Sequence, residues 1–381
     1  MISLGKMLES ILYVLYGVLV LVLIVGARQL RFAYTHFKMK QMVTPPDIID
    51  TMPSVTVCIP ARNETHAMTD SLQKVIASTY PKLEIIVLDD VSGDDTSVLI
   101  KSFAHEGVRF VEGTALPDGW LGRNHALQEL LQEASGTYIF FMDVDTHIAP
   151  DTIEQLVAYA DQEDVSMVSV LPRRIDGPRA SVFFSTLRYF WEVIFNRKDA
   201  PATSGSAWLI NRKVLLDTFH GFAALKANIH PESVMSAQLA KTDHYRFLMS
   251  TEQLGISYEK KWRSQVETSV RLLYPLLGAK TAHAVIGGLD LLIVAGPFFV
   301  VLAGFITGWG IHQIISGALL LLFAALYASY LKRVWNRGWL VGGLLWPYIV
   351  LQELVLLIMS TERYSRRAVT WKGRVVRLPK A

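Results

Sequence analysis

Two acidic motifs stand directly after short apolar runs and are suited to bind a charged ligand. Asp89 and Asp90 follow Val87-Leu88, and Asp143-Val144-Asp145 follows Phe141-Met142. Runs of Val, Leu and Phe are typical of buried strands, and open α/β sheets bind ligands at the carboxyl ends of their strands. Carboxylates there can hold a nucleotide and the hard cation that accompanies its phosphates.

The two motifs predict different contacts. Asp89 or Asp90 can accept a hydrogen bond from a uracil N–H or a ribose hydroxyl. Asp143 and Asp145 occupy alternate positions as their strand ends, so one can bind a divalent metal while the other reaches the ribose or a metal-bound water. Together they indicate an enzyme that handles a nucleotide-sugar.

Two further segments add polar groups to this predicted site. Ile59 to Glu64 follows the first strand, where a base and ribose can rest on the backbone; its candidate residues are Pro60, Ala61, Arg62 and Glu64. Trp120 to Asn124 opens a helix, so backbone N–H groups of Gly122, Arg123 and Asn124, with the Arg123 guanidinium, can meet a pyrophosphate.

Each motif also has a simpler explanation. A lone Asp-x-Asp is most often an exposed turn, Asp89-Asp90 can belong to a helix-capping turn, and Gly-Arg-Asn alone indicates little. What favours a site is their order, at four successive strand ends of one predicted sheet.

Strands and helices alternate from residue 55 to residue 142. The pattern predicts strands at 55–59, 83–88, 108–111 and 137–142 and helices at 69–78, 96–105 and 124–134. Such alternation implies βαβ units with right-handed crossovers. Residues 150–265 are less regular, with a strand-like 165–171 and a helix-like 232–240. The expected fold class is α/β, with a mixed, mostly parallel sheet and flanking helices.

Long uncharged stretches predict a membrane protein. The 381-residue chain is 51% hydrophobic, and neither Ser10–Ala27 nor Leu291–Leu331 contains Asp, Glu, Lys or Arg. The first is about one bilayer crossing long and the second about two. Basic residues after the first run, such as Arg28 and Lys38, favour an uncleaved anchor over a signal peptide and place the following residues in the cytosol.

The last apolar stretch, Gly338–Ser360, has an ambiguous topology. Pro347 and Glu353 interrupt it, and a full crossing would put the basic tail from Thr361 outside, against the positive-inside rule. A re-entrant or interfacial segment is the alternative.

Charge and cysteine content exclude other classes. The net charge of +3 is small, and the basic residues are not gathered into one helix or loop, so we expect no nucleic-acid partner. The single cysteine, Cys58, has no partner for an internal disulfide and is expected to be a small core residue, which suits a cytosolic face.

The expected organisation has five parts. They are an anchor with its basic flank (1–40), a linker (41–53), a cytosolic catalytic domain (54–272), a membrane region of two to three spans (273–360) and a basic tail (361–381).

Residues 54 to about 150 resemble family 2 glycosyltransferases with the GT-A fold. The resemblance rests on Ile-Pro-Ala-Arg-Asn-Glu (59–64), on Asp-Asp followed by Ser-Gly-Asp-Asp-Thr (89–96), and on Met-Asp-Val-Asp (142–145). Trp-Leu-Gly-Arg-Asn-His-Ala (120–126) and Trp-Lys-Gly-Arg (371–374) narrow it to a membrane-anchored subgroup that acts on lipids. That subgroup includes carotenoid (diaponeurosporenoate) and hopanoid-associated glycosyltransferases.

The resemblance implies residue roles. Asp90 with Asp89 would hold the uridine, and Asp145, with Asp143 beside it, a divalent metal (Mg²⁺ or Mn²⁺). The family usually has an acidic pair opening a late helix, where this chain has Ile-His-Pro-Glu-Ser (229–233). Glu232 is then the candidate catalytic base, although it could equally be a helix-dipole partner; His230 is the runner-up.

These expectations describe an inverting hexosyltransferase of the plasma membrane. It would move a sugar from a UDP-sugar to a membrane lipid such as a carotenoid, another isoprenoid or a glycerolipid, with its catalytic domain on the cytosolic face. A processive polysaccharide synthase is one alternative, although Gln-x-x-Arg-Trp is absent. A catalytically impaired GT-A subunit is another. A transporter is disfavoured because the spans are few and lie outside the acidic motifs.

Overall fold

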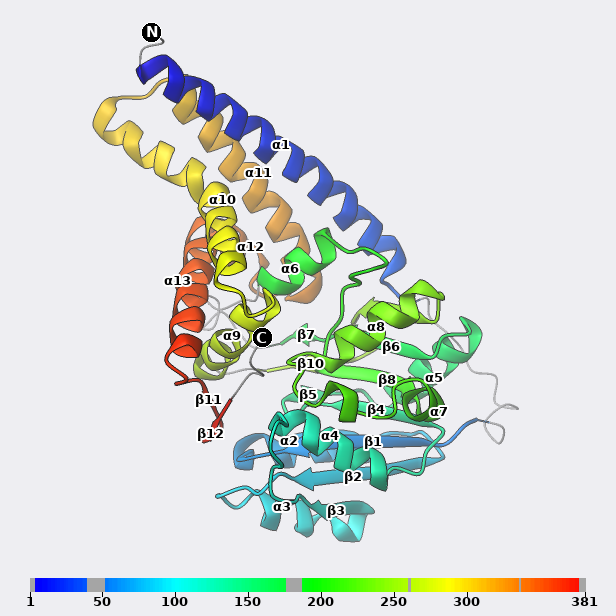
Figure 1. Cartoon of the computed structure of the whole chain (residues 1–381). Helices are drawn as coiled ribbons and strands as arrows, with labels where there is room; N and C mark the ends of the chain where they lie inside the picture. Colours follow the sequence, from blue (N-terminus) through cyan, green and yellow to red (C-terminus); the bar gives the residue numbers. More distant parts are fainter. Residues whose placement is uncertain (1–3, 40–51, 176–186, 260–261, 336, 377–381) are drawn as a thin grey trace. The chain divides into compact units, whose positions relative to one another are not determined.

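The chain folds into two units, each assembled from separate stretches of sequence. The computed structural model describes residues 4–39, 52–175, 187–259, 262–335 and 337–376 (Figure 1). A sheet unit comprises Thr35–Ile175, Asn196–Glu259 and Lys372–Ala381, and a helical unit comprises Met1–Tyr34, Asp176–Phe195 and Lys260–Trp371. Nearly all of the predicted linker lies outside the described residues.

The sheet unit contains a seven-stranded sheet in the order β3-β2-β1-β4-β8-β6-β9. β1 pairs in parallel with β2 and β4, β2 with β3, and β6 with β9, while β8 runs antiparallel to both of its neighbours. The predicted mixed, mostly parallel sheet is therefore confirmed. Its strands are β1 (Val55–Ala61), β2 (Leu83–Asp89), β3 (Val108–Glu112), β4 (Tyr138–Met142), β6 (Met167–Leu171), β8 (Ala207–Asn211) and β9 (Tyr245–Met249).

Helices and short strands complete this unit. The helices are α2 (Thr65–Ile76), α3 (Thr96–Ser102), η2 (Ala104–Glu106), α4 (Gly122–Glu133), α5 (Thr152–Gln162), α7 (Arg212–Asp217), η4 (Ala223–Leu225) and α8 (Pro231–Lys241). A second sheet joins β5 (Thr146–His147), β10 (Ser257–Tyr258) and β7 (Arg173–Arg174). The irregular region after residue 150 therefore holds strands that alternation alone did not predict.

The central strands are buried on both faces, as continuous apolar runs require. Alternate residues of β1 point to opposite faces. Val57 and Ile59 belong to a core cluster with residues of α2 and α5. Cys58, between them, is fully buried and its thiol lies 4.0 Å from the Leu130 carbonyl of α4. It is a core residue, as expected.

Helix α2 begins at Thr65, four residues before the predicted start at residue 69. Its first two residues, Thr65 and His66, are polar and give no amphipathic signal, but the loop after β2 holds this end of the helix. The backbone N–H of Glu64 donates to Thr96 Oγ1 at 2.9 Å, and the Thr65 hydroxyl contacts Asp94. A tertiary contact therefore fixes this helix start.

The helical unit contains three helices that are long and apolar enough to cross a membrane, among the described residues. They are Glu9–His36 within α1 (Leu4–His36), α10 (Thr281–Thr307) and α11 (Ile311–Val334). Gly308, Trp309 and Gly310 separate α10 from α11. The unit also contains α6 (Leu187–Ile194), α9 (Trp262–Leu276), α12 (Trp339–Leu344), α13 (Trp346–Ser365) and the short strand β11 (Thr370–Trp371). Residues of α6 and α9, which we expected in the domain at 54–272, group with this unit.

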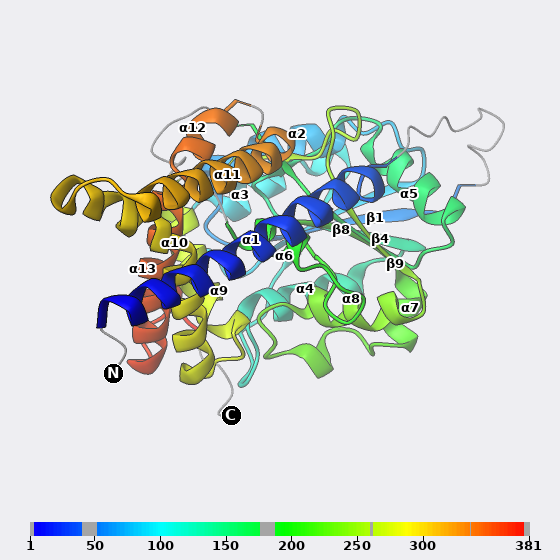
Figure 2. The ribbon, with the colours of Figure 1, turned by 90° about the horizontal axis from the view of Figure 1, so that it is seen from above.

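Helices α1 and α11 lie side by side and run in the same direction (Figures 1 and 2). Tyr16 bonds Ser316 and Tyr34 bonds Ser329, each at 3.1 Å between hydroxyl oxygens, so contacts advance along both helices together. Arg333 lies over the Tyr34 ring, 4.7 Å from its centroid. The basic ends of the two helices are therefore at the same end of the bundle.

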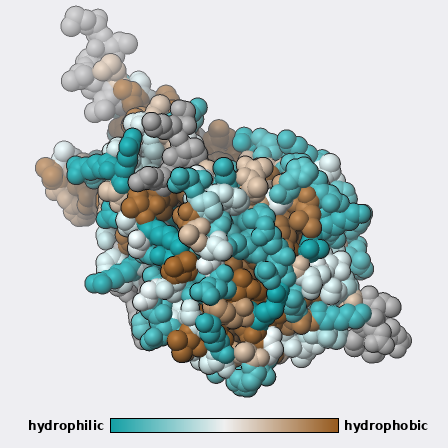
Figure 3. Space-filling model, turned by 60° about the horizontal axis from the view of Figure 1, so that its bottom comes forward, coloured by the Kyte–Doolittle hydropathy of each residue, from teal (hydrophilic) through white to brown (hydrophobic). Residues whose placement is uncertain are grey.

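Hydrophobic exposure is concentrated on these long helices. Ile24, Ile306 and Leu321 are 60%, 90% and 70% exposed. By contrast, the face drawn in Figure 3 shows hydrophobic residues in small groups among hydrophilic ones. Exposed apolar helix surface of this length fits a hydrocarbon environment.

The aromatic core behind β4 and β8 yields a stability prediction. Trp208 is fully buried and stacks on Phe141 with ring centroids 4.5 Å apart, and its indole N–H has no hydrogen-bond partner among the described residues. Trp208→Ala should cost about 3–5 kcal/mol because it leaves a large cavity. Trp208→Phe keeps a stacked ring and removes an unsatisfied donor, so it should cost much less. Thermal unfolding in detergent measures both; equal losses in the two variants would contradict this packing.

Candidate active site

Three strands bring the predicted motifs to one edge of the sheet. β1 and β2 are parallel, and Ala61 at the end of β1 pairs with Asp89 at the end of β2. β4 lies on the other side of β1, with Phe141 opposite Cys58, so Asp143 emerges at the same edge. The residues that follow all three strands are therefore neighbours in space.

The turn after β2 gives its two aspartates different surroundings. Asp89 is buried, accepts a hydrogen bond from the Ser92 backbone N–H at 3.2 Å and contacts the hydroxyls of Ser92 and Ser97. Asp90 points elsewhere: Arg374 Nη1 lies 2.6 and 2.5 Å from its two carboxylate oxygens. Asp89 thus holds the turn, while Asp90 presents a carboxylate that binds a cationic side chain.

Segment 59–64 packs against the same turn. Ala61 accepts a hydrogen bond from the Asp90 backbone N–H at 2.8 Å, which continues the ladder after Pro60. The Arg62 guanidinium donates to the backbone carbonyls of Asp90 and Val91. Arg62 therefore ties segment 59–64 to the backbone of the turn that follows β2.

Glu64, Asp143 and Asp145 form a concentration of negative charge. Burial raises the pKa of Glu64, Lys372 opposes this rise, and the charges of Asp145 and Asp143 add to it. Like charges this close destabilise one another unless a cation is near. The negative charge at this edge of the sheet therefore favours the binding of cations.

The donor atoms of this edge fit a divalent metal in chemical type. Mg²⁺ and Mn²⁺ prefer carboxylate oxygens, and Mg²⁺ usually takes one or two carboxylates together with substrate phosphates. Within the part of the chain that the structure describes, no group of three or more His, Cys, Asp or Glu side chains could hold a metal on its own. Asp143 and Asp145 fit a metal completed by a phosphorylated substrate.

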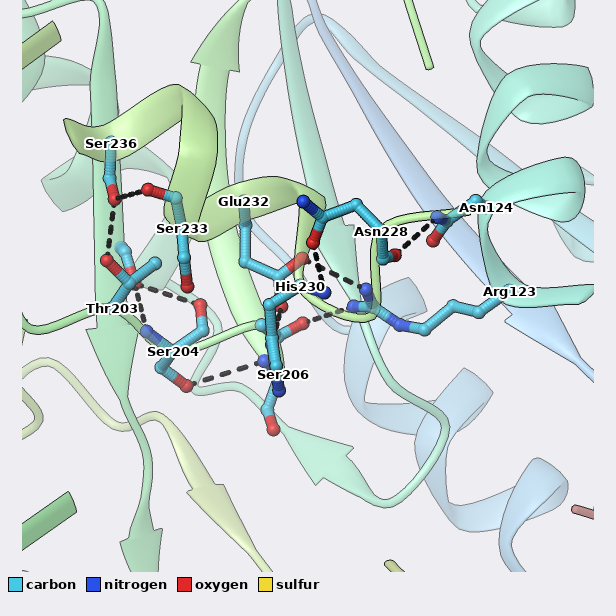
Figure 4. Close-up of polar contacts among 12 residues, drawn as sticks. Arg123, Asn124, Thr203, Ser204, Ser206, Asn228, His230, Glu232, Ser233 and Ser236 are labelled. Atoms are coloured by element: carbon cyan, nitrogen blue, oxygen red, sulfur yellow. Dashed lines mark hydrogen bonds and ion pairs between the residues drawn. The ribbon is translucent and has the colours of Figure 1, made fainter. Parts of the chain in front are cut away.

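Helix α4 directs the Arg123 side chain toward Glu232 (Figure 4). Its Nη1 lies 3.2 Å from Glu232 Oε2, and its Nη2 lies 3.7 Å from Asp143 Oδ1. Nη2 also donates to the Gly205 carbonyl at 2.7 Å. One guanidinium thus connects the predicted metal motif with the predicted base.

Glu232 is buried yet charged. It is 1% exposed, and His230 Nδ1 lies 2.8 Å from its Oε1. Burial alone would raise the pKa of Glu232, but the charges of Arg123 and His230 and the hydrogen bond from His230 outweigh it and hold that pKa well below its usual range. Glu232 is therefore a carboxylate at neutral pH.

Asn124 supports the entry to α8. Its side-chain amide donates to the carbonyls of Leu225, Lys226 and Asn228 at 2.8, 3.2 and 2.7 Å. The Asn228 side chain in turn accepts from the His230 backbone N–H at 2.9 Å. Neighbouring residues of α4, Arg123 and Asn124, thus hold the base candidate and the loop that leads to it.

Gly205 and Ser206 also lie at this edge, although no motif in the sequence singled them out. Because β8 is antiparallel to β4, its first residue, Ala207, pairs with Met142, and the loop before it lies at the motif edge. The Asp143 backbone N–H donates to the Ser206 carbonyl at 3.0 Å. A Cβ built on Gly205 would lie 2.0 Å from Glu232 Oε1, so only glycine leaves room for that carboxylate. The small polar run Thr-Ser-Gly-Ser (203–206) was the available signal.

Two tryptophans near the site have different surroundings. Trp208 is a core residue, because it comes from the buried β8 strand. Trp120 contacts His125 edge-on at 5.5 Å between ring centroids.

Residues 56–219 match the family model described as glycosyl transferase family 2. The chain carries a family 2 glycosyltransferase domain. The matched segment contains all four strand-end motifs, whereas Glu232 and the tail residues Lys372 and Arg374 lie beyond it.

Relatives of known name agree with this family. The chain is 33% identical over 125 residues, 32% of its length, to 4,4'-diaponeurosporenoate glycosyltransferase of Staphylococcus aureus (strain USA300). That match spans about a third (32%) of the curated relative's own length.

A solved structure resembles nearly the whole chain. The mannosyltransferase PcManGT from Pyrobaculum calidifontis, in complex with GDP-Man and Mn2+, is similar with a TM-score of 0.57 and 20% identity. The similarity covers 93% of this chain and 98% of that one. At this identity it bears on the fold alone, and the predicted GT-A fold is confirmed.

The Arg123–Glu232 ion pair yields a stability prediction. Arg123→Ala should destabilise the protein by about 3–5 kcal/mol, because Glu232 would be left as a poorly compensated buried charge. Arg123→Ala/Glu232→Gln should recover part of this loss. Thermal unfolding of wild type, both single variants and the double variant in detergent gives the coupling; additive losses would contradict the pairing.

The same pair predicts a pH dependence. The folded pKa of Glu232 lies below its unfolded value of about 4.3, so its stabilising contribution is present above that pH and is lost as the pH falls. The gap in melting temperature between wild type and Arg123→Ala should therefore be widest above about pH 5 and narrow progressively as the pH falls below about 4. A constant gap would show that another interaction causes it.

Proposed function

We propose that this protein is an inverting hexosyltransferase that moves a sugar from a UDP-sugar to a membrane lipid. The observation that carries the proposal is the meeting, at one sheet edge, of the Asp143–Asp145 carboxylates with the Arg123–Glu232–His230 group. A donor site and a proton acceptor adjoin there, which is the minimum that glycosyl transfer requires.

In the donor half, the Asp90 carboxylate accepts a hydrogen bond from the uridine, and Arg62 supports the backbone beside Asp90. Asp145 and Asp143 are the residues that would hold a divalent metal, which when bound would neutralise charge on the departing diphosphate. Arg123 and the first backbone N–H groups of α4 face the same leaving group. The named PcManGT complex contains a nucleotide-sugar and Mn2+, which supports this arrangement.

In the acceptor half, Glu232 takes the proton from the attacking hydroxyl. A carboxylate paired with Arg123 and His230 is a weak base. The interactions of Glu232 with these two residues therefore have to weaken before it can accept a proton. Arg123 Nη2 lies 3.7 Å from Asp143 Oδ1, so a diphosphate that binds beside Asp143 offers the guanidinium a further anion. Arg123 would then share its charge, and the pKa of Glu232 would rise towards a useful value.

A lipid acceptor is supported by three apolar helices and by the curated relative named for a carotenoid substrate. The basic ends of α1 and α11 lie together, which by the positive-inside rule favours the cytosolic side of a plasma membrane. We propose a multi-pass protein whose catalytic domain, 54–272 in the sequence-based division, faces the cytosol.

The decisive experiment incubates purified full-length protein with UDP-glucose, other UDP-hexoses or GDP-mannose, each with a total lipid extract. We expect a hexose mass added to a lipid with a UDP-sugar and divalent metal, and loss of transfer on chelation. Mass spectrometry identifies the product. Only water-soluble products or long polymers would contradict the lipid assignment and favour a processive synthase, and no transfer with any donor would favour an impaired subunit.

Substitutions test the residue roles. Asp145→Asn and Glu232→Gln should each lower kcat by about 10²-fold or more, since each removes a charge or proton acceptor required in the transition state. Asp243→Asn is the matched control, because Asp243 is 75% exposed and pairs with Arg246. Wild-type turnover by either active-site variant would contradict its assignment.

A further inference from the structure

The Lys372–Arg374 segment of the tail contacts the carboxylates predicted to bind the donor. Arg374 bonds both carboxylate oxygens of Asp90 and lies 3.3 Å from the Asp90 carbonyl through Nη2. The Lys372 ammonium contacts Glu64, and its carbonyl accepts from Arg62 Nε at 3.1 Å. Two cations from the far end of the sequence thus stand at the acidic sheet edge.

The backbone of the tail is shaped to present these two side chains. Lys372 and Gly373 have φ angles of 45° and 82°, and consecutive positive φ values are typical of a tight two-residue turn. Glycine favours this conformation at the second position. The turn is followed at once by β12 (Arg374–Val375).

These contacts are partly buried and electrostatically costly. Arg374 is 19% and Asp90 4% exposed, while Lys372 and Glu64 are 21% and 26% exposed. Burial raises the pKa of Asp90, against the ion pair with Arg374 and the charge of Arg62. At this edge Lys372 pairs with Glu64 and Arg374 with Asp90, and Arg62 lies close enough for its charge to act on Asp90.

Arg374 also stands beside the start of α4. A Cβ built on Gly122 would lie 3.3 Å from Arg374 Nη1 and 3.5 Å from Asp90 Oδ2. A cation is disfavoured at the positive end of a helix dipole unless an anion is close. Asp90 is that anion here, and a second anion would be attracted by Arg374 and the helix end together.

We propose that Lys372 and Arg374 bind the diphosphate of the nucleotide-sugar donor, an inference that rests on the proposed function. When the donor arrives, the two cations exchange contacts with Glu64 and Asp90 for contacts with phosphate oxygens, and Asp90 becomes able to accept from the base or ribose. Arginine and lysine are the usual side-chain partners of phosphate. The donor site is then completed by the tail.

Ligand fragments test this assignment. UDP, pyrophosphate and uridine are titrated by calorimetry into full-length protein, in a detergent that carries no phosphate. Arg374→Gln and Lys372→Gln should each lower the affinity for UDP and for pyrophosphate about tenfold or more, which is the expected effect of losing a charge-assisted hydrogen bond. The affinity for uridine should not change. Arg374→Lys should recover part of the affinity because it restores the charge.

Arg366→Gln is the matched control, because Arg366 is 73% exposed and pairs with Glu362 at 2.8 Å. It should bind all three ligands as wild type does. Melting temperatures of all variants tell a lost contact from a lost fold.

Three results would overturn the inference. Tighter UDP binding by the glutamine variants would make the tail a lock that excludes the donor. An equal loss of affinity for uridine and for UDP would mean that Arg374 acts on the nucleoside through Asp90 and does not bind the diphosphate. Unchanged UDP binding would leave only a structural ion pair. In each case wild type still binds UDP and transfers sugar; absence of both in wild type would instead refute the proposed function.

Discussion

A buried carboxylate stabilised by one guanidinium organises the site. Glu232 is 1% exposed, and such a charge is tolerated only when it is paired and hydrogen-bonded. Arg123 provides the pairing, His230 a second contact, and Gly205 the space. Removing any of the three would leave Glu232 either uncompensated or displaced, so α4, α8 and the loop before β8 are constrained together.

The sheet explains why these elements can meet. Parallel β1, β2 and β4 deliver Arg62, Asp90 and Asp143 to one edge. β8, between β4 and β6, is antiparallel to both of them. Its first residue, rather than its last, therefore lies at this edge of the sheet. Loop 203–206 joins the site for that reason alone. Strand direction therefore decides which loops can contribute.

The distribution of charge suggests how donor and acceptor chemistry are linked. Arg123 lies between Asp143 and Glu232, and Arg374 lies on Asp90. Cationic side chains thus pair with Asp90 on one side of the site and with Glu232 on the other. A diphosphate would compete for these cations, so in our proposal donor binding frees Asp90 and strengthens Glu232 as a base.

The sequence by itself determined the local features of this protein. Apolar runs ending in acids located β1, β2 and β4 with their motifs, and uncharged stretches located α1, α10 and α11, because burial and bilayer thickness leave direct marks on composition. It also identified Glu232 as an acid opening a helix. Tertiary structure alone decided the partners of that acid, the start of α2 at Thr65, the use of Gly205, and the reach of Lys372 and Arg374 to residues about 300 positions away. Such contacts depend on strand order and direction, and pairing between distant segments leaves no periodic trace in the sequence.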